Sequence, residues 1–81
     1  MDITKIINFR ELSGITSIID FNYGVLTIDG TKHNVCAVVI GDKLTPAKKA
    51  EIMTYKNVVK IGTCNYRHAP EITHDVVYLK I

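Results

Sequence analysis

The stretch from Val35 to Cys64, VCAVVIGDKLTPAKKAEIMTYKNVVKIGTC, decides the fold that this sequence predicts. Residues 35–40 are apolar without a break, which is typical of a strand buried on both faces. Thr45 followed by Pro46 predicts the start of a helix, because Thr caps free backbone amides and Pro suits the first helical position. We expect this helix to continue to about residue 56, where the apolar spacing ends.

A second apolar segment follows this predicted helix. Asn57 is a residue type that can end a helix in a left-handed conformation, and residues 58–61 then have the composition of a strand. A strand, a helix and a strand of these lengths are typical of a crossover between parallel strands. We therefore expect the strands at 35–40 and 58–61 to be parallel neighbours in one sheet.

The segment before this unit predicts an antiparallel meander. Ile15–Phe21 and Val25–Ile28 have strand composition, and Asn22-Tyr23-Gly24 between them is a turn signal. Asp29-Gly30 then predicts a tight hairpin, because this pair favours the turns whose twist matches antiparallel strands. The hairpin leads directly into the buried strand at 35–40.

The N-terminal segment Asp2–Leu12 fits two structures. Its apolar residues lie near helical spacing, with Asp2 as a cap and Gly14 as a stop, but they also alternate in part as in a strand. We favour a short helix, because residues 10–14 resemble a helix end.

The C-terminal segment predicts a loop and a last strand. Residues 65–71 contain Asn, Pro and charged side chains, and Val76–Ile81 is again apolar. We expect this last strand to pair antiparallel with the strand at 58–61. The predicted fold is α/β (α+β mixed): one small domain over residues 1–81, with a mixed sheet of about five strands and one or two helices.

Composition excludes several classes of protein. A hydrophobic content of 47% is too high for a disordered chain, and a net charge of +2 is not that of an acidic mimic. The sequence has no apolar run of membrane-spanning length and no signal-peptide pattern, so we expect a cytoplasmic protein that does not engage membranes. Abundant Ile, Lys, Asn and Thr are typical of an AT-rich bacterial or phage gene, which suggests a phage or mobile-element origin.

Cysteine and histidine residues have the spacing of zinc ligands. The pairs are His33 with Cys36 and Cys64 with His68, and His74 is a spare. In the predicted topology, however, Cys36 lies near the start of one strand and Cys64 lies beyond the end of its neighbour. We therefore expect no metal site and no cofactor, and we interpret Cys36 as a small core residue.

The sheet edge where the crossover turns is the predicted ligand site. Ligands of open α/β sheets bind beyond the carboxyl ends of the strands, and a helix N-terminus attracts anions. Lysines in the first turn of a helix are disfavoured by its dipole, so their presence there suggests an anion nearby. The residues predicted to bind a ligand are Lys43, Thr45, Lys48, Lys49, Tyr66, Arg67 and His68.

Catalysis is the alternative chemistry. Cys64 with His68 could form a thiolate–imidazole pair, and Asp42, His74 and Asp75 lie on neighbouring segments. So short a chain leaves few residues to enclose a substrate. We therefore assign no catalytic residue and favour binding over enzymatic activity.

The function predicted from the sequence is that of a small, non-enzymatic binding or regulatory protein. Its partner would be a protein, a nucleic acid or nucleotide, or another phosphate-bearing ligand, bound through the helix start at 43–49 and the loop at 65–74. The alternative is a small enzyme that acts on a nucleotide or phosphorylated substrate through Cys64 and His68. A homodimer through a free sheet edge, formed by the last strand or by the strand from Ile15, is a further expectation.

Overall fold

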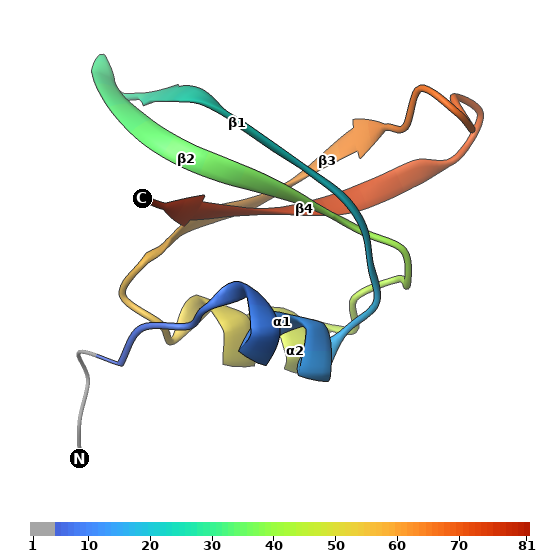
Figure 1. Cartoon of the computed structure of the whole chain (residues 1–81), viewed down its shortest axis with the longest axis horizontal. Helices are drawn as coiled ribbons and strands as arrows, with labels where there is room; N and C mark the ends of the chain where they lie inside the picture. The colour runs from blue at the N-terminus through green and yellow to red at the C-terminus, as the bar shows by residue number, and fades with distance from the viewer. Residues whose placement is uncertain (1–4) are drawn as a thin grey trace.

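The computed structural model describes residues 5–81, which form two helices and a four-stranded sheet (Figure 1). In chain order, the elements are α1 (Phe9–Ile15), β1 (Ile18–Ile28), β2 (Thr31–Ile40), α2 (Pro46–Met53), β3 (Val58–Asn65) and β4 (Thr73–Lys80). The expected combination of a sheet with helices is therefore confirmed, although the sheet has four strands where about five were expected.

The strand order corrects the predicted topology. The order is β1-β2-β4-β3, and every neighbouring pair is antiparallel. β2 and β3 therefore run in the same direction, as expected, but β4 lies between them, so the prediction that they are neighbours was wrong. The physical reason lies in β4 itself. Val76 and Val77 point to opposite faces and are 2% and 0% exposed. A strand that is buried on both faces is favoured in the interior of a sheet, between two other strands.

The first two expected strands are one strand. β1 pairs with β2 without interruption from Asp20 to Ile28, and Gly24 lies opposite Val35 within this ladder. Among the described glycines only Gly30 has a positive φ, so Gly24 takes the extended conformation and the turn predicted at 22–24 does not form. The hairpin predicted at Asp29-Gly30 is confirmed: φ is 49° at Asp29 and 81° at Gly30, as a type I′ turn requires.

Both helices begin with the caps that their sequences encode. Thr45 accepts a hydrogen bond from the amide of Lys48 and Pro46 takes the first position of α2, as predicted. α1 is the helix favoured for the N-terminal segment, but it begins after Asn8, which forms a capping box with Glu11. Asp2, the expected cap, lies outside the described residues.

The helix ends differ from those predicted. α1 includes Gly14 and ends beyond it, where the Thr16 amide donates to the Leu12 carbonyl. α2 ends at Met53, about one turn before residue 56. Asn57 is not in the left-handed conformation expected of it, because Asp29 is the one non-glycine residue with positive φ in the described chain. Its side chain instead binds the backbone of Ile7.

The core lies between the sheet and the two helices, which cover the same face (Figure 1). Along β2 and β4 every second residue points to this face, so the strands contribute alternate apolar side chains. Burying each large aliphatic side chain contributes about 1.5–3 kcal/mol to stability. The core consists of Ile7, Leu12, Cys36, Val38, Ile40, Leu44, Ile52, Val58, Val77 and Leu79.

Candidate functional site

A hollow of about 430 Å³ joins the segment before α2 to the start of β4. Gly41, Asp42 and Lys43 line one side, and residues 72–75 with Thr63 line the other. These segments meet because β2 and β3 run in the same direction, which places their carboxyl ends at one edge of the sheet. The structure therefore brings Lys43 next to the end of the β3–β4 loop, although the two strands are not neighbours.

A second hollow, of about 340 Å³, lies on the other side of the β3–β4 loop. Tyr66 and Arg67 line it together with the end of β3, and residues 20–22 of β1 with Val39 complete it. β1 and β3 are the two outer strands of the sheet. Both can border one hollow only because the sheet curls across the face that the helices leave open.

The loop between the hollows, residues 66–72, is held by its own backbone. The Ala69 amide donates to the Tyr66 carbonyl at 2.9 Å, and the Ile72 amide donates to the Ala69 carbonyl at 3.0 Å. The side-chain amide of Asn65 donates to the Pro70 carbonyl at 2.7 Å. Two consecutive turns and one side-chain hydrogen bond therefore fix the backbone of the loop, which defines where its exposed side chains project.

Three rings form a cluster at the base of this loop. The Tyr66 ring meets the rings of His68 and His74 edge to face, with centroids 5.2 and 5.9 Å away. Nδ1 of His74 lies 3.2 Å from the Ile40 carbonyl oxygen and donates to it when it carries the ring proton. The half-buried Tyr66 is thereby positioned, while Arg67 and His68 are exposed beside it.

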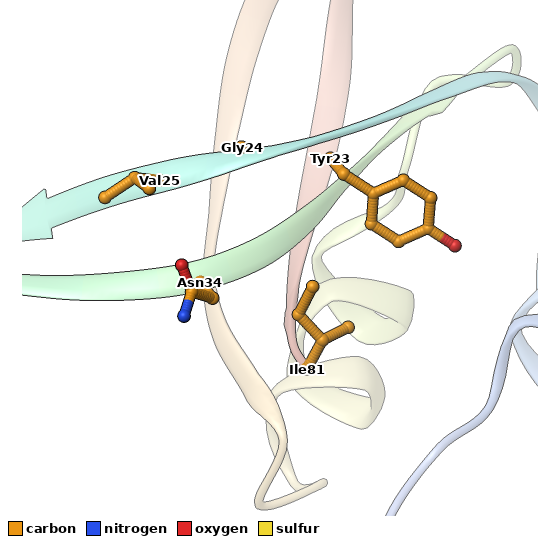
Figure 2. A pocket seen from close by; sticks show the side chains of 5 residues that line it. All are labelled: Tyr23, Gly24, Val25, Asn34 and Ile81. Carbon is orange, nitrogen blue, oxygen red and sulfur yellow. The ribbon is translucent and has the colours of Figure 1, made fainter.

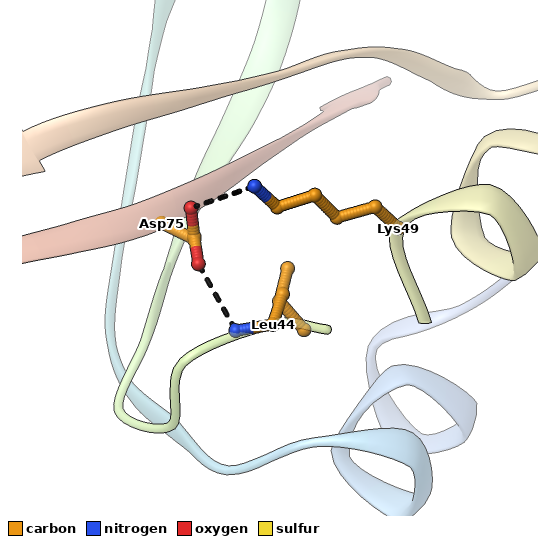
Figure 3. A network of polar contacts seen from close by, with 3 residues as sticks. All are labelled: Leu44, Lys49 and Asp75. Carbon is orange, nitrogen blue, oxygen red and sulfur yellow. Dashed lines mark hydrogen bonds and ion pairs between the residues drawn. The ribbon is translucent and has the colours of Figure 1, made fainter. Parts of the chain in front are cut away.

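An aspartate occupies the start of α2 (Figure 3). Oδ2 of Asp75 accepts a hydrogen bond from the Leu44 amide at 3.1 Å, and Oδ1 lies 3.7 Å from Nζ of Lys49. The Asp75 side chain is only 12% exposed, so this carboxylate sits where a bound anion was expected. Lys49 therefore has an anionic partner within the chain, and the sequence around Asp75 did not reveal this role.

The predicted ligand-binding residues fall into two groups. Thr45 and Lys48 are joined by the capping hydrogen bond, and Lys49 forms the ion pair with Asp75. No hydrogen bond or ion pair within residues 5–81 engages the side chain of Lys43, Arg67 or His68, and all three residues are exposed. Together with Tyr66 and the half-buried Lys48, whose capping bond uses only its backbone amide, they are the predicted residues whose side chains are available to a partner.

The two cysteines that have the spacing of zinc ligands lie at different levels of the sheet. Cys36 is opposite Leu79 of β4, whereas Cys64 is opposite His74. Those β4 residues are five positions apart, which corresponds to about 17 Å along a strand. Within the described chain no three His, Cys, Asp or Glu side chains form a group that could hold a metal ion.

The two cysteines also differ in environment. Cys36 belongs to the core, and burial raises the pKa of its thiol above the ordinary value of 9.0, an effect that a hydrogen bond with the Asn22 backbone partly offsets. Cys64 is half-buried in the second hollow and faces His74 across the β3–β4 pair. The histidine beside Cys64 in the ladder is therefore His74, whereas His68 contacts the Tyr66 ring.

Comparison of the chain with protein-family models, with curated protein sequences and with solved structures finds no match. Within residues 5–81, neither helix has the length and apolar character that crossing a membrane would require.

Proposed function

We propose that this chain is a small, non-enzymatic binding protein that engages a protein partner through the β3–β4 loop and the segment before α2. The observation that carries the proposal is the pair of hollows on either side of a backbone-fixed loop that presents Tyr66 and Arg67. Tyrosine and arginine are the residue types that most often anchor protein interfaces. Lys43 at the rim of the first hollow adds a second exposed cation.

A macromolecular partner suits this surface better than a small anion. The segment that leads into α2, where an anion was expected, already holds the Asp75 carboxylate through the Leu44 amide and Lys49. A free phosphate would have to displace that carboxylate from the Leu44 amide. The exposed cations lie further out, on separate segments, where a larger ligand can contact both.

A protein partner is favoured over a nucleic acid by the modest charge. The net charge is +2 and the isoelectric point is about 8.6, below the value of about 9 that is typical of nucleic-acid-binding domains. Arg67 and Lys43 are also accompanied by Asp42 and Glu71 in the same region. Acidic and aromatic side chains of a protein would complement this mixed surface. The cytoplasmic location and the phage or mobile-element origin expected from the sequence remain proposals.

Affinity capture with matched variants tests this function. The tagged wild-type chain is incubated with an extract of the native cells, with and without nuclease, and the retained proteins are quantified by mass spectrometry. Tyr66→Ala and Arg67→Glu should each lower retention of the partner by about tenfold or more, because truncating an interface anchor costs at least about 1.4 kcal/mol. Lys32→Glu reverses the same charge on the exposed part of β2 and should retain the partner fully.

Two outcomes would reject the proposal. Equal retention by wild type, Tyr66→Ala and Arg67→Glu would show that the loop is not the binding surface. Retention that disappears with nuclease would assign the partner to nucleic acid. Thermal melting of each variant provides the folding control: Arg67→Glu lies on the surface and should leave the midpoint nearly unchanged, whereas Tyr66→Ala also removes the ring contacts with His68 and His74, so retention is compared well below both midpoints.

A small enzyme is the second candidate, because Cys64 faces His74 in the β3–β4 ladder and both are half-buried. A histidine that activates this thiol would make Cys64 react with iodoacetamide near neutral pH. His74→Gln should then slow alkylation of Cys64 by about tenfold or more, whereas His68→Gln should not. Equal alkylation rates in wild type and His74→Gln would remove the pair from any mechanism.

A further inference from the structure

β1 is a long outer strand whose outward edge has no partner strand within residues 5–81. It comprises 11 residues and pairs with β2 on one side only. The tight turn at Asp29-Gly30 makes Ile28 and Thr31 a hydrogen-bonded pair, so the even-numbered residues from 22 to 28 bond to β2. The odd-numbered residues from 21 to 27 therefore direct their amides and carbonyls away from the sheet.

The same odd-numbered residues carry an exposed apolar row. Phe21, Tyr23 and Val25 are 48%, 63% and 61% exposed. The Phe21 ring packs edge to face against the Phe9 ring of α1, with the ring centroids 5.3 Å apart. Figure 2 shows Tyr23 and Val25 on β1, with Asn34 and Ile81 below them in this view. These residues, with Gly24, line a hollow of about 520 Å³, so the apolar surface continues inward from the edge.

Beyond its first three residues, this edge lacks the features that normally prevent strands from associating. Residues 21–28 contain no charged side chain and no proline, and their pairing with β2 is regular. Each outer strand has one register shift beside a charged residue: that of β1 lies between Ile18 and Asp20, before this segment, and that of β3 lies between Val58 and Lys60. Residues 21–28 of β1 therefore offer a regular, uncharged edge to a further strand.

We propose that β1 pairs antiparallel with β1 of a second copy of this chain, about a two-fold axis at Tyr23. Tyr23 is the midpoint of Ile18–Ile28, and this register pairs residues 20–26, which follow the register shift of β1, with the same residues of the other copy. Tyr23 then faces its own counterpart, and Phe21 faces Val25 of the other copy. The two four-stranded sheets form one continuous sheet with the apolar rows side by side.

Charge and symmetry together make a second copy the fitting occupant. Asp20, the only charged residue of β1, falls opposite Leu26 of the other copy, so no like charges face each other across the pair. Aromatic–aromatic and aromatic–β-branched pairs are among the favourable cross-strand contacts, and this register makes both. A strand of another sequence could bond to the backbone groups of the odd-numbered residues, but it would not reproduce these side-chain pairs.

The oligomeric state of the purified chain tests the proposal. Sedimentation equilibrium of the wild type should give the mass of two chains at concentrations of tens to hundreds of micromolar, the range expected of a modest interface. Tyr23→Lys places a charge at the axis and should raise the dissociation constant by about tenfold or more. Ala50→Lys adds the same charge at an exposed position of α2 and should leave the dimer intact.

Cysteine pairs test the register, in chains that also carry Cys64→Ser. Asn22 and Gly24 of the two copies face each other as a non-hydrogen-bonded pair, with Cα atoms about 4.5 Å apart, which permits a disulfide. A side chain at Gly24 meets nothing within 4 Å, so Gly24→Cys fits without a clash. Asn22→Cys and Gly24→Cys chains should cross-link when mixed under mild oxidation, and neither should cross-link alone.

Each contrary result rejects a defined part of the proposal. A wild-type chain that stays monomeric throughout, or a dimer that Tyr23→Lys leaves unchanged, would overturn edge pairing through β1. A dimer that Tyr23→Lys disrupts, but whose mixed cysteine variants do not cross-link, would overturn the axis at Tyr23. Circular dichroism of Tyr23→Lys confirms folding, because this side chain is largely exposed and contributes little to the core.

Discussion

Asn57 binds both backbone groups of Ile7, a residue 50 positions earlier in the chain. Its Oδ1 accepts from the Ile7 amide at 2.9 Å, and its Nδ2 donates to the Ile7 carbonyl at 2.7 Å. The two bonds reproduce the pairing that a neighbouring strand would offer. They fix the segment before α1, so that Ile7, which is 1% exposed, stays in the core.

Replacing Asn57 should therefore destabilise the fold markedly. Asn57→Ala leaves an amide and a carbonyl of Ile7 without partners, and we expect a loss of about 2–3 kcal/mol in the free energy of unfolding. Asn57→Asp keeps the acceptor for the Ile7 amide but places a second acceptor oxygen against the Ile7 carbonyl, so it should be destabilising as well. Urea denaturation of the three proteins measures these differences.

Asn65 provides the matched control for this prediction. Its side chain makes one exposed hydrogen bond, to the Pro70 carbonyl, so Asn65→Ala should cost about 0.5–1 kcal/mol. If Asn57→Ala and Asn65→Ala had equal effects, the bridge to Ile7 would contribute nothing beyond an ordinary surface contact.

The two partners of Asp75 should contribute unequally to stability. Lys49 is 46% exposed and lies 3.7 Å from the carboxylate, so Lys49→Met should cost less than about 1 kcal/mol, and less still at high salt. Asp75→Ala also removes the acceptor from the Leu44 amide and should cost about 1.5–3 kcal/mol. Equal losses in the two variants, measured by urea denaturation, would mean that the ion pair dominates.

Two local signals in the sequence predicted local structure correctly. Thr45-Pro46 and Asp29-Gly30 act through their own backbone conformations and through neighbours three residues away, so their roles can be read without the rest of the chain. Gly24 has the composition of a turn residue, yet pairing with β2 holds it extended. Tertiary pairing decided that position, and it cannot be deduced from the residues on either side.

Strand order and the site depend on contacts between distant residues. The apolar pattern of residues 35–61 predicted the common direction of β2 and β3 but not the insertion of β4 between them. Strands that run in the same direction have their carboxyl ends on the same side of the sheet. The prediction that Lys43 lies near the β3–β4 loop therefore needed only the common direction of β2 and β3, which was correct. Asp75 was considered only for catalysis, since nothing in its sequence neighbourhood indicates a contact with Leu44.

Gly41 should tolerate no side chain. A Cβ there would lie 2.7 Å from Cγ2 of Ile19 and 3.3 Å from Oγ of Ser17, while the Gly41 amide donates to the Ser17 carbonyl and prevents the backbone from moving away. Gly41→Ala should cost about 1–3 kcal/mol of the free energy of unfolding. In an Ile19→Ala background the same substitution should cost less, because the closest atom is gone.

Gly14 offers the opposite result for the same substitution. It lies within α1, and a Cβ there meets nothing within 4 Å, so Gly14→Ala should stabilise the protein by about 0.5–1 kcal/mol. Thermal denaturation of both alanine variants compares the two positions directly. A destabilising Gly14→Ala, or a neutral Gly41→Ala, would contradict the packing described for that site.

Cys36 should make stability decrease at alkaline pH. Burial raises the pKa of this thiol above 9.0 in the folded chain, so unfolding releases a proton once the pH exceeds the pKa of the exposed thiol. The contribution is fully present below about pH 9 and is lost as the pH rises through the raised pKa, by up to about 1.4 kcal/mol per pH unit.

Urea denaturation between about pH 7 and 11 measures the loss, in chains that carry Cys64→Ala so that Cys36 is the only thiol. Lysines and tyrosines titrate in the same range, and Cys36→Ala corrects for them because it keeps every other group. The stability advantage of Cys36 over alanine should therefore shrink as the pH rises, and an advantage that stays constant to pH 11 would show that the buried thiol is not ionising on unfolding.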